Sequence, residues 1–298
     1  MNSDHRILVT GATGATGGYA IDHLLAKGAQ VRAFVRSDDA RAQALRDRGV
    51  EVALGDLVDF HSVRSAMQGV HAAYFVYPIM QPGILNATAF FAEAARESGV
   101  QAVVNMSQIS ARRDAASHAA RDHWFSEQVF NWSGIPTTHL RPTFFMEWLL
   151  YGFQLPLIAQ HGILQVPAGE GRHAPIAAED QGRLIAAILL EPARHVGKVY
   201  PLFGAKEMNH QQIAAAVGEA LGREIRYVPE SIEGFEQRLS ALGLPEHFIQ
   251  HVSAVYRDYQ NGIFAGHDSL IQDITGLPPM TVQQFVQEKR DRFMPGSN

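Results

Sequence analysis

The chain has 298 residues, of which 46% are hydrophobic and 18% are charged, and its formal net charge is −5. This composition is ordinary for a packed globular protein, and the lack of any cluster of Lys and Arg argues against binding to nucleic acid. Cysteine is absent, which excludes disulfides, thiolate nucleophiles, iron–sulfur ligation and most structural zinc sites.

The first half of the chain alternates short apolar, β-rich runs with stretches whose apolar residues recur at helical spacing. We expect strands over residues 6–10, 30–36, 50–55, 71–78, 101–107 and 136–142. The helical stretches between them each close on a glycine, the residue that best tolerates the left-handed end of a helix: Gly28, Gly49, Gly69, Gly99 and Gly134. This alternation predicts βαβ units, and hence an α/β fold of Rossmann type with a doubly wound parallel sheet and helices on both faces.

After Pro142 the pattern changes. The aromatic segment 143–162 is expected to be helical, and a short strand pair is expected near 162–171. Further helices are expected over 177–192, 209–221 and 231–262, with a strand over 197–204. These segments predict a smaller, mainly helical subdomain.

The stretch "VTGATGATGG" places Gly11, Gly14 and Gly17 between the first strand and the first helix. In a dinucleotide-binding fold the first such glycine makes the turn, the second lets a pyrophosphate approach the backbone, and the third lets the helix pack closely. The alternative is a structural turn without a ligand. We therefore expect residues 1–150 to form an NAD(P)-binding domain and 151–298 to form a substrate-binding subdomain, with about 174–203 returning to the main domain.

The second expected strand ends on Arg36. An acidic side chain at this position would bind the ribose of NAD, whereas a guanidinium suits the 2′-phosphate of NADP. The alternative is an arginine that merely faces solvent. The residue type favours NADP(H) over NAD(H).

The N-terminus has no signal-peptide pattern, and the most apolar segment is too short and too interrupted to span a membrane. We expect a soluble, cytoplasmic protein whose partner is a small molecule, without nucleic acid or membrane. A homodimer is compatible with the sequence.

Several motifs together resemble the NmrA-like branch of the atypical short-chain dehydrogenase/reductases: "GATGATGG", the "VR" ending at Arg36, "GVEVALGDL", "HWFSEQVFNWSGIPTTHLRPTFFME" and "LPEHF". The resemblance covers nearly the whole chain. Within the branch it is greatest to the NADPH-dependent quinone oxidoreductase and triphenylmethane reductase types.

The resemblance implies a cofactor site and a substrate site. It places the pyrophosphate against Thr13, Gly14, Ala15, Thr16 and Gly17, the adenine beside Asp56 and Leu57, the rest of the cofactor along Val76, Tyr77 and Pro78, and the nicotinamide among Met106, Ser107, Pro142, Phe144 and Phe145. Phe144, Phe145, Trp148 and Tyr151 could form an apolar pocket wall, with Trp148 and Tyr151 toward the substrate, or could be plain core.

One feature departs from ordinary short-chain dehydrogenases, which use a Tyr-x-x-x-Lys pair. None of the eight tyrosines has a lysine four residues later, and no lysine occurs between Lys27 and Lys198. The position that the family often fills with lysine is His123. This histidine could bind the nicotinamide ribose or the substrate, or supply a proton, or it could be a helix residue satisfied by a neighbour.

Ser107 and a pair of histidines have alternative roles. Ser107 ends the fifth expected strand, where ligands gather in open α/β sheets, but its hydroxyl could equally cap a turn. His247 and His251 have a helical spacing seen in zinc sites, yet no third ligand accompanies them, so we expect no metal.

Two functions fit these features. One is an NAD(P)H-dependent oxidoreductase that transfers hydride to a small, planar, electron-poor acceptor such as a quinone or a dye, for which little acid catalysis is needed. The other is a non-catalytic NADP-sensing regulator that binds a protein partner. The aromatic segment after Pro142 favours the enzyme.

Overall fold

The computed structural model describes residues 5–294, which form two compact units. Unit 1 contains the residues up to Asp114, together with Arg121–Arg141 and Ala178–Tyr200. Unit 2 contains Ala115–Ala120, Pro142–Ala177 and the residues from Pro201 onward. Within residues 5–294, no helix is long and apolar enough to cross a membrane.

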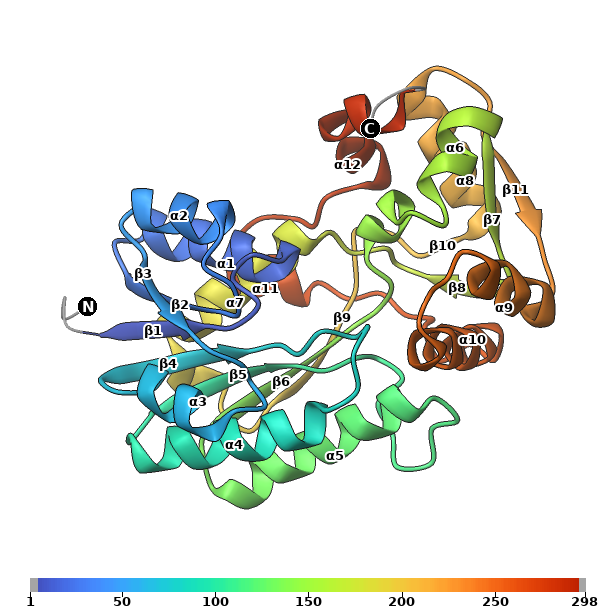
Figure 1. Ribbon diagram of the computed structural model, residues 1–298. Coiled ribbons are helices and arrows are strands. Elements are labelled where there is room, and N and C mark those ends of the chain that lie inside the picture. The colour runs from blue at the N-terminus through green and yellow to red at the C-terminus, as the bar shows by residue number, and fades with distance from the viewer. Residues whose placement is uncertain (1–4, 295–298) are drawn as a thin grey trace. The chain divides into compact units, whose positions relative to one another are not determined.

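A seven-stranded sheet, in the order β3-β2-β1-β4-β5-β6-β9, forms the centre of unit 1 (Figure 1). The strands are β1 (Arg6–Val9), β2 (Gln30–Val35), β3 (Glu51–Leu54), β4 (Val70–Phe75), β5 (Ala102–Met106), β6 (Thr137–Pro142) and β9 (Val199–Leu202). The pairs from β3 through to β6 are parallel. The predicted α/β fold of Rossmann type is confirmed. The strand order reverses at β1 and β4, and ligands of doubly wound sheets bind beyond the carboxyl ends of the strands at such a point.

Helices cover both faces of this sheet (Figure 1). They are α1 (Ala15–Ala26), α2 (Ala40–Asp47), α3 (Phe60–Ala66), α4 (Ile84–Glu97), α5 (His118–Ser133) and α7 (Ala178–Leu190), with a 3₁₀ turn η2 (Pro192–Arg194). In Figure 1, α3, α4 and α5 lie on one face, and α1, α2 and α7 lie on the other. The glycines that were expected to end the first five helices all have left-handed backbone angles, with φ between 70° and 81°. Leu8, Phe75, Phe91 and Phe130 are buried in the core between the sheet and the helices.

Unit 2 contains two small strand pairs and short helices. Its strands are β7 (Ile163–Val166), β8 (Arg172–His173), β10 (Met208–Asn209) and β11 (Arg226–Pro229), and its helices are η1 (Met146–Leu150), α6 (Leu155–His161), α8 (His210–Leu221), α9 (Ile232–Ala241), α10 (Glu246–Gln260), α11 (Leu270–Thr275), α12 (Val282–Glu288) and η3 (Arg290–Phe293). It has its own core, in which Ile158, Val217, Val286 and Phe293 are fully buried.

The structure refines three expectations for the second half. The segment 143–162 is helical only from η1 onward, because Phe144 and Met146 exchange backbone hydrogen bonds with Ile176 and hold the chain extended before η1 begins. The strand near 162–171 does not pair locally, since β7 pairs in parallel with β11. The helical region expected over 231–262 is divided into α9 and α10, since Gly243 is left-handed and Pro245 precedes α10.

Candidate active site

In the turn after β1, glycine occupies each of three positions for a different physical reason. Gly11 has φ 57°, which side chains rarely allow. A Cβ at Gly17 would lie 2.3 Å from the Gly11 carbonyl oxygen, so α1 packs directly against the turn. Gly14 is the extended N-cap of α1, and a Cβ there would meet only the Gly11 oxygen, at 3.2 Å. The fold therefore requires glycine at positions 11 and 17, whereas the glycine at 14 keeps the space above the helix N-terminus open.

A cavity of about 220 Å³ lies beyond the carboxyl ends of β1, β2, β3 and β4. Of the predicted cofactor residues, Gly11, Thr13, Arg36, Asp56, Leu57, Val76, Tyr77 and Pro78 line it. The structure adds Ala12, Phe34, Val35, Ser37, Arg41, Gly55 and Gln81, which the sequence analysis did not single out. Gln81 carries no sequence signal, because it lies in the loop after β4 and reaches the cavity only through the fold.

Four predicted pyrophosphate residues do not line this cavity. Gly14, Ala15, Thr16 and Gly17 form the N-cap and first turn of α1. The Thr16 side chain is buried, and its hydroxyl lies 3.0 Å from the hydroxyl of Tyr74.

Two arginines line the cavity and differ in whether a carboxylate binds them. Arg41 is held by Asp39, with Nη2 2.6 Å and Nε 3.0 Å from Oδ2, and these hydrogen bonds lower the pKa of the Asp39 carboxyl. Arg36 is exposed, forms no ion pair among the described residues, and contacts only the Gln81 side chain at 3.4 Å. Arg36 is thus the cation that is available to an anionic ligand.

His123 and Ser107 are both buried in unit 1 with an unsatisfied polar atom. Among the described residues, the Ser107 hydroxyl, directly after β5, has no hydrogen-bond partner, nor does Nδ1 of His123 on α5. Burial lowers the pKa of His123 to about 4 despite the opposing influence of Glu127. The imidazole is therefore neutral at pH 7, when it can form hydrogen bonds but does not act as an imidazolium acid. Glu127 is itself held by Arg141 at 2.6 Å and 2.8 Å.

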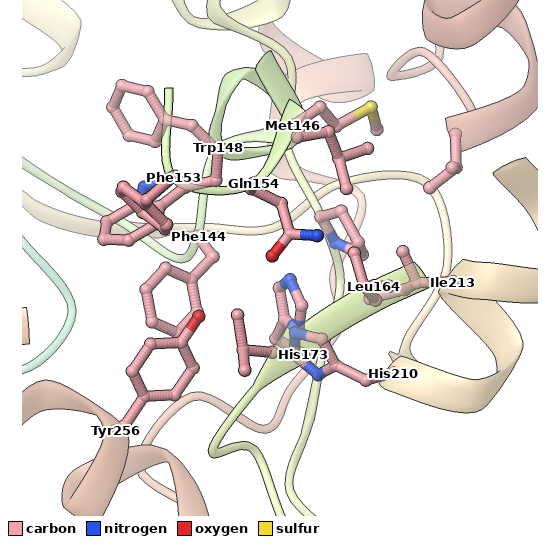
Figure 2. Close-up of a pocket in the computed structure, with 15 residues that line it drawn as sticks. Phe144, Met146, Trp148, Phe153, Gln154, Leu164, His173, His210, Ile213 and Tyr256 are labelled. Atoms are coloured by element: carbon pink, nitrogen blue, oxygen red, sulfur yellow. The ribbon is translucent and has the colours of Figure 1, made fainter. Parts of the chain in front are cut away.

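A second cavity, of about 40 Å³, lies inside unit 2 (Figure 2). Phe144, Phe145 and Trp148, for which the sequence left a pocket wall and plain core both open, line this cavity. Tyr151 does not line it but stacks on Trp148 with ring centroids 5.2 Å apart. Pro142 and Met106 end β6 and β5 and line neither cavity.

The polar groups of this second cavity were not foreseen from the sequence. They are Gln154, His173, His210 and Tyr256. Burial lowers the pKa of His210 to about 3, lowers that of His173, and raises that of the Tyr256 hydroxyl well above its usual value. All four groups are therefore uncharged at neutral pH, and the cavity suits an uncharged ligand.

His247 and His251 stand on α10. The His251 Nδ1 lies 2.8 Å from the hydroxyl of Ser117, which also accepts a hydrogen bond from the Ala120 amide. Within the described part of the chain, no group of three His, Cys, Asp or Glu residues could hold a metal ion.

Residues 3–285 match the NmrA-like family. The chain belongs to this family. The resemblance predicted from the motifs is confirmed over nearly the full length.

This NmrA-like chain is similar to several named oxidoreductases. It is 31% identical over 287 residues to the NAD(P)H azoreductase of Xenophilus azovorans, covering 96% of this chain and 99% of that protein. The NADPH complex of the NADPH-dependent quinone oxidoreductase of Escherichia coli superposes with a TM-score of 0.85 at 28% identity, covering 95% and 99% of the two chains. The triphenylmethane reductase of Citrobacter sp. complexed with NADP(H) gives a TM-score of 0.82 at 26% identity, with the same coverage. This NmrA-like protein is an oxidoreductase.

Proposed function

We propose that the protein is an NADPH-dependent reductase that transfers hydride to a small, planar, electron-poor acceptor such as a quinone or a dye. The observation that carries this proposal is the aromatic cavity of unit 2, whose polar groups are all uncharged. The names of the relatives, which include an azoreductase, a quinone oxidoreductase and a dye reductase, support the same acceptor class.

The turn after β1 fits a dinucleotide cofactor. Gly14 places no side chain at the N-cap of α1, and the N-terminus of a helix attracts phosphate through its N–H groups and its dipole. We assign the pyrophosphate to Thr13, Gly14, Ala15, Thr16 and Gly17 and the adenosine end to the first cavity, beside Asp56 and Leu57. In its reduced form the nicotinamide supplies the hydride.

Arg36 supports a preference for NADPH over NADH. Its guanidinium has no carboxylate partner among residues 5–294, so a 2′-phosphate would supply the missing anion. Arg41 lies at the same cavity but already binds Asp39. We therefore assign the 2′-phosphate to Arg36.

His123 and Ser107 are the candidates for holding the nicotinamide end. Each is buried and has a polar atom without a partner, which is costly unless a ligand or water satisfies it. Because His123 is neutral, we assign it a positioning hydrogen bond and not the delivery of a proton. Met106, Pro142, Phe144 and Phe145 are assigned to the same end on family resemblance.

Acceptors of this class explain how the site works without a Tyr–Lys pair. Charge that develops on a quinone or dye spreads over a conjugated system, so orientation contributes more than acid catalysis. The rings of Trp148, Phe144 and Tyr256 supply flat apolar surface for such orientation.

The test is NADPH oxidation measured against a panel of quinones, azo dyes and triphenylmethane dyes, beside a direct titration of NADPH binding. We expect submillimolar binding of NADPH and turnover with at least one conjugated acceptor. Tight NADPH binding with no turnover across the panel would contradict the proposal and favour a cofactor-sensing regulator.

A further inference from the structure

At the cavity of unit 2, two histidine rings are both within hydrogen-bond distance of one tyrosine hydroxyl. The hydroxyl of Tyr259 lies 2.9 Å from Nδ1 of His173 and 3.1 Å from Nδ1 of His210. The same hydroxyl donates to the carbonyl oxygen of Gly171 at 3.1 Å. Both histidines line the cavity, whereas Tyr259 is fully buried behind them.

A count of protons fixes the state of both rings. A phenol has one proton and two lone pairs, and the Gly171 carbonyl can only accept. Tyr259 therefore gives its proton to Gly171, and each Nδ1 donates an N–H to one of its lone pairs. Burial lowers the pKa of both histidines, so each ring is neutral and carries only this one proton. The other nitrogen, Nε2, is then an unprotonated acceptor in both rings.

Gln154 adds a third acceptor to the same cavity. Its side-chain nitrogen donates to the carbonyl of Ile163 at 3.2 Å, which fixes the orientation of the amide. The residue is only 2% exposed, and its Oε1 is buried without a hydrogen-bond partner within residues 5–294. Figure 2 shows the Gln154 amide and the two imidazole rings facing the same space. A buried acceptor without a partner is costly, so a ligand group that donates a hydrogen bond here gains a strong interaction.

We propose that the cavity of unit 2 binds its ligand through a hydrogen-bond-donating group, an aromatic hydroxyl or amine, received by Gln154 Oε1 and by the imidazole Nε2 of His173 or His210. In this scheme Tyr259 is a positioning residue, because it holds both imidazoles in the acceptor tautomer without touching the ligand. The inference rests on the proposed function only in taking this ligand to be the hydride acceptor.

The size of the cavity agrees with a substituent and not with a whole ring system. A volume of about 40 Å³ holds about three or four waters, at about 10–15 Å³ each on this measure. One hydroxyl or amino group at the edge of a larger aromatic ligand fits that space, while the surrounding rings of Phe144, Trp148 and Tyr256 contact the ligand's own ring.

The experiment compares two ligands that differ in one substituent, the 2-amino and 2-methyl derivatives of 1,4-naphthoquinone. Calorimetric titration into the NADP⁺-loaded protein measures binding with no hydride available for turnover. We expect the amino derivative to bind about tenfold more tightly or better, because the methyl group leaves the acceptors unpaired.

Two variants test the two kinds of acceptor. Gln154→Met keeps the length of the side chain and removes Oε1, so the preference for the amino ligand is expected to fall severalfold. Tyr259→Phe removes the group that fixes the tautomers and is expected to reduce the preference in the same way. Tyr227→Phe is the matched control, because the Tyr227 ring lies beside His210 while its hydroxyl bonds to backbone groups, among them those of Val166 and Ala168. It should keep the full preference.

A second readout keeps the inference testable if a variant does not fold. Nitrogen-15 correlation spectra of the parent protein report the tautomer of each histidine directly, and we expect His173 and His210 to carry their proton on Nδ1. A proton on Nε2 of both rings would overturn the inference, as would equal affinity for the two ligands or no binding of either.

Failure of this inference can be told apart from failure of the proposed function. If the protein reduces quinones but does not prefer the amino ligand, the reductase assignment stands and the acceptor cavity is refuted. If it prefers the amino ligand but reduces no acceptor, the cavity is a binding site and the proposed function is wrong.

Discussion

At the scale of single residues, cofactor choice is concentrated on Arg36. We expect Arg36→Ala to weaken NADPH binding by about tenfold or more, because a charge-assisted contact contributes about 1.5–3 kcal/mol. NADH binding should not change, since NADH has no 2′-phosphate. Titrations of both cofactors into parent and variant check this, with Arg41→Ala as the comparison. Equal affinity of the parent protein for NADPH and NADH would refute the assignment.

Two glycines of the same turn should respond differently to the same change. Gly14→Val is expected to abolish dinucleotide binding while the protein stays folded, because its Cβ meets only one atom at 3.2 Å. Gly17→Val should destabilise the fold itself, since its Cβ would lie 2.3 Å from a backbone oxygen. Circular dichroism and thermal melting separate the two outcomes. A folded Gly14→Val protein that binds NADPH normally would show that the cradle is misassigned.

His123 is a candidate for positioning the nicotinamide, and its neutral imidazole should be recognisable in the rate of hydride transfer. We expect His123→Ala to slow hydride transfer in single turnovers by about 10- to 100-fold, less than the roughly 10²–10⁴ of a full general acid. Cofactor affinity should change little, and His123→Asn should recover part of the rate. Because the pKa of His123 is about 4, the parent rate should be flat from pH 6 to 8. A variant that matches the parent rate with every acceptor would exclude His123 from the site.

At the scale of elements, the sequence was most informative where the backbone hydrogen bonds are local. The first five helices and the glycines that end them follow from helical spacing and from the left-handed stop. The strands of the central sheet pair over long distances in the chain, but each was predicted from a short apolar run. The extended start of the segment after Pro142 was not predicted, because it depends on backbone hydrogen bonds from Phe144 and Met146 to Ile176, which is far along the chain. The pairing of β7 with β11 is equally non-local, and no turn motif in the sequence predicts it.

The same limit explains what was missed in the site. The glycine turn and Arg36 have sequence patterns with a known physical reason. Gln154, His173 and His210 come from three separate elements of unit 2, and only the fold brings them to one cavity. Their chemistry depends on burial, which the sequence around each residue does not reveal.

The buried histidines of unit 2 make a prediction about acid stability. The folded pKa of His210, about 3, lies below its unfolded value of 6.5, so the unfolded chain binds the proton first as the pH falls. Stability is therefore complete above pH 6.5 and decreases as the pH falls from 6.5 toward 3, by about 3 kcal/mol at pH 4 from this residue. Melting temperatures of the parent and of His210→Gln at pH 7 and pH 4.5 check this. The variant should lose less stability than the parent between the two pH values, whereas the control His247→Gln should lose as much.

At the scale of the whole molecule, cofactor binding should stabilise the protein by mass action. NADPH at a hundredfold excess over its dissociation constant contributes about 2.7 kcal/mol, which should raise the melting temperature by several degrees. The shift should be smaller with NADH at the same concentration and absent in Gly14→Val. If NADPH does not change the melting temperature of the parent protein, the cofactor assignment is contradicted.

The connectivity of the two units has a consequence for how the protein is made. The chain passes between them five times, after Asp114, Ala120, Arg141, Ala177 and Tyr200. Domains generally form as their residues leave the ribosome, N-terminal parts first. Here unit 1 has all its residues only once Tyr200 has been synthesised, and by then pieces of unit 2 have already emerged without the helices that cover them. Synthesis thus leaves the aromatic segment around Phe144 and Trp148 without its packing partners on α10 until that helix follows, and apolar surface exposed in this way favours aggregation.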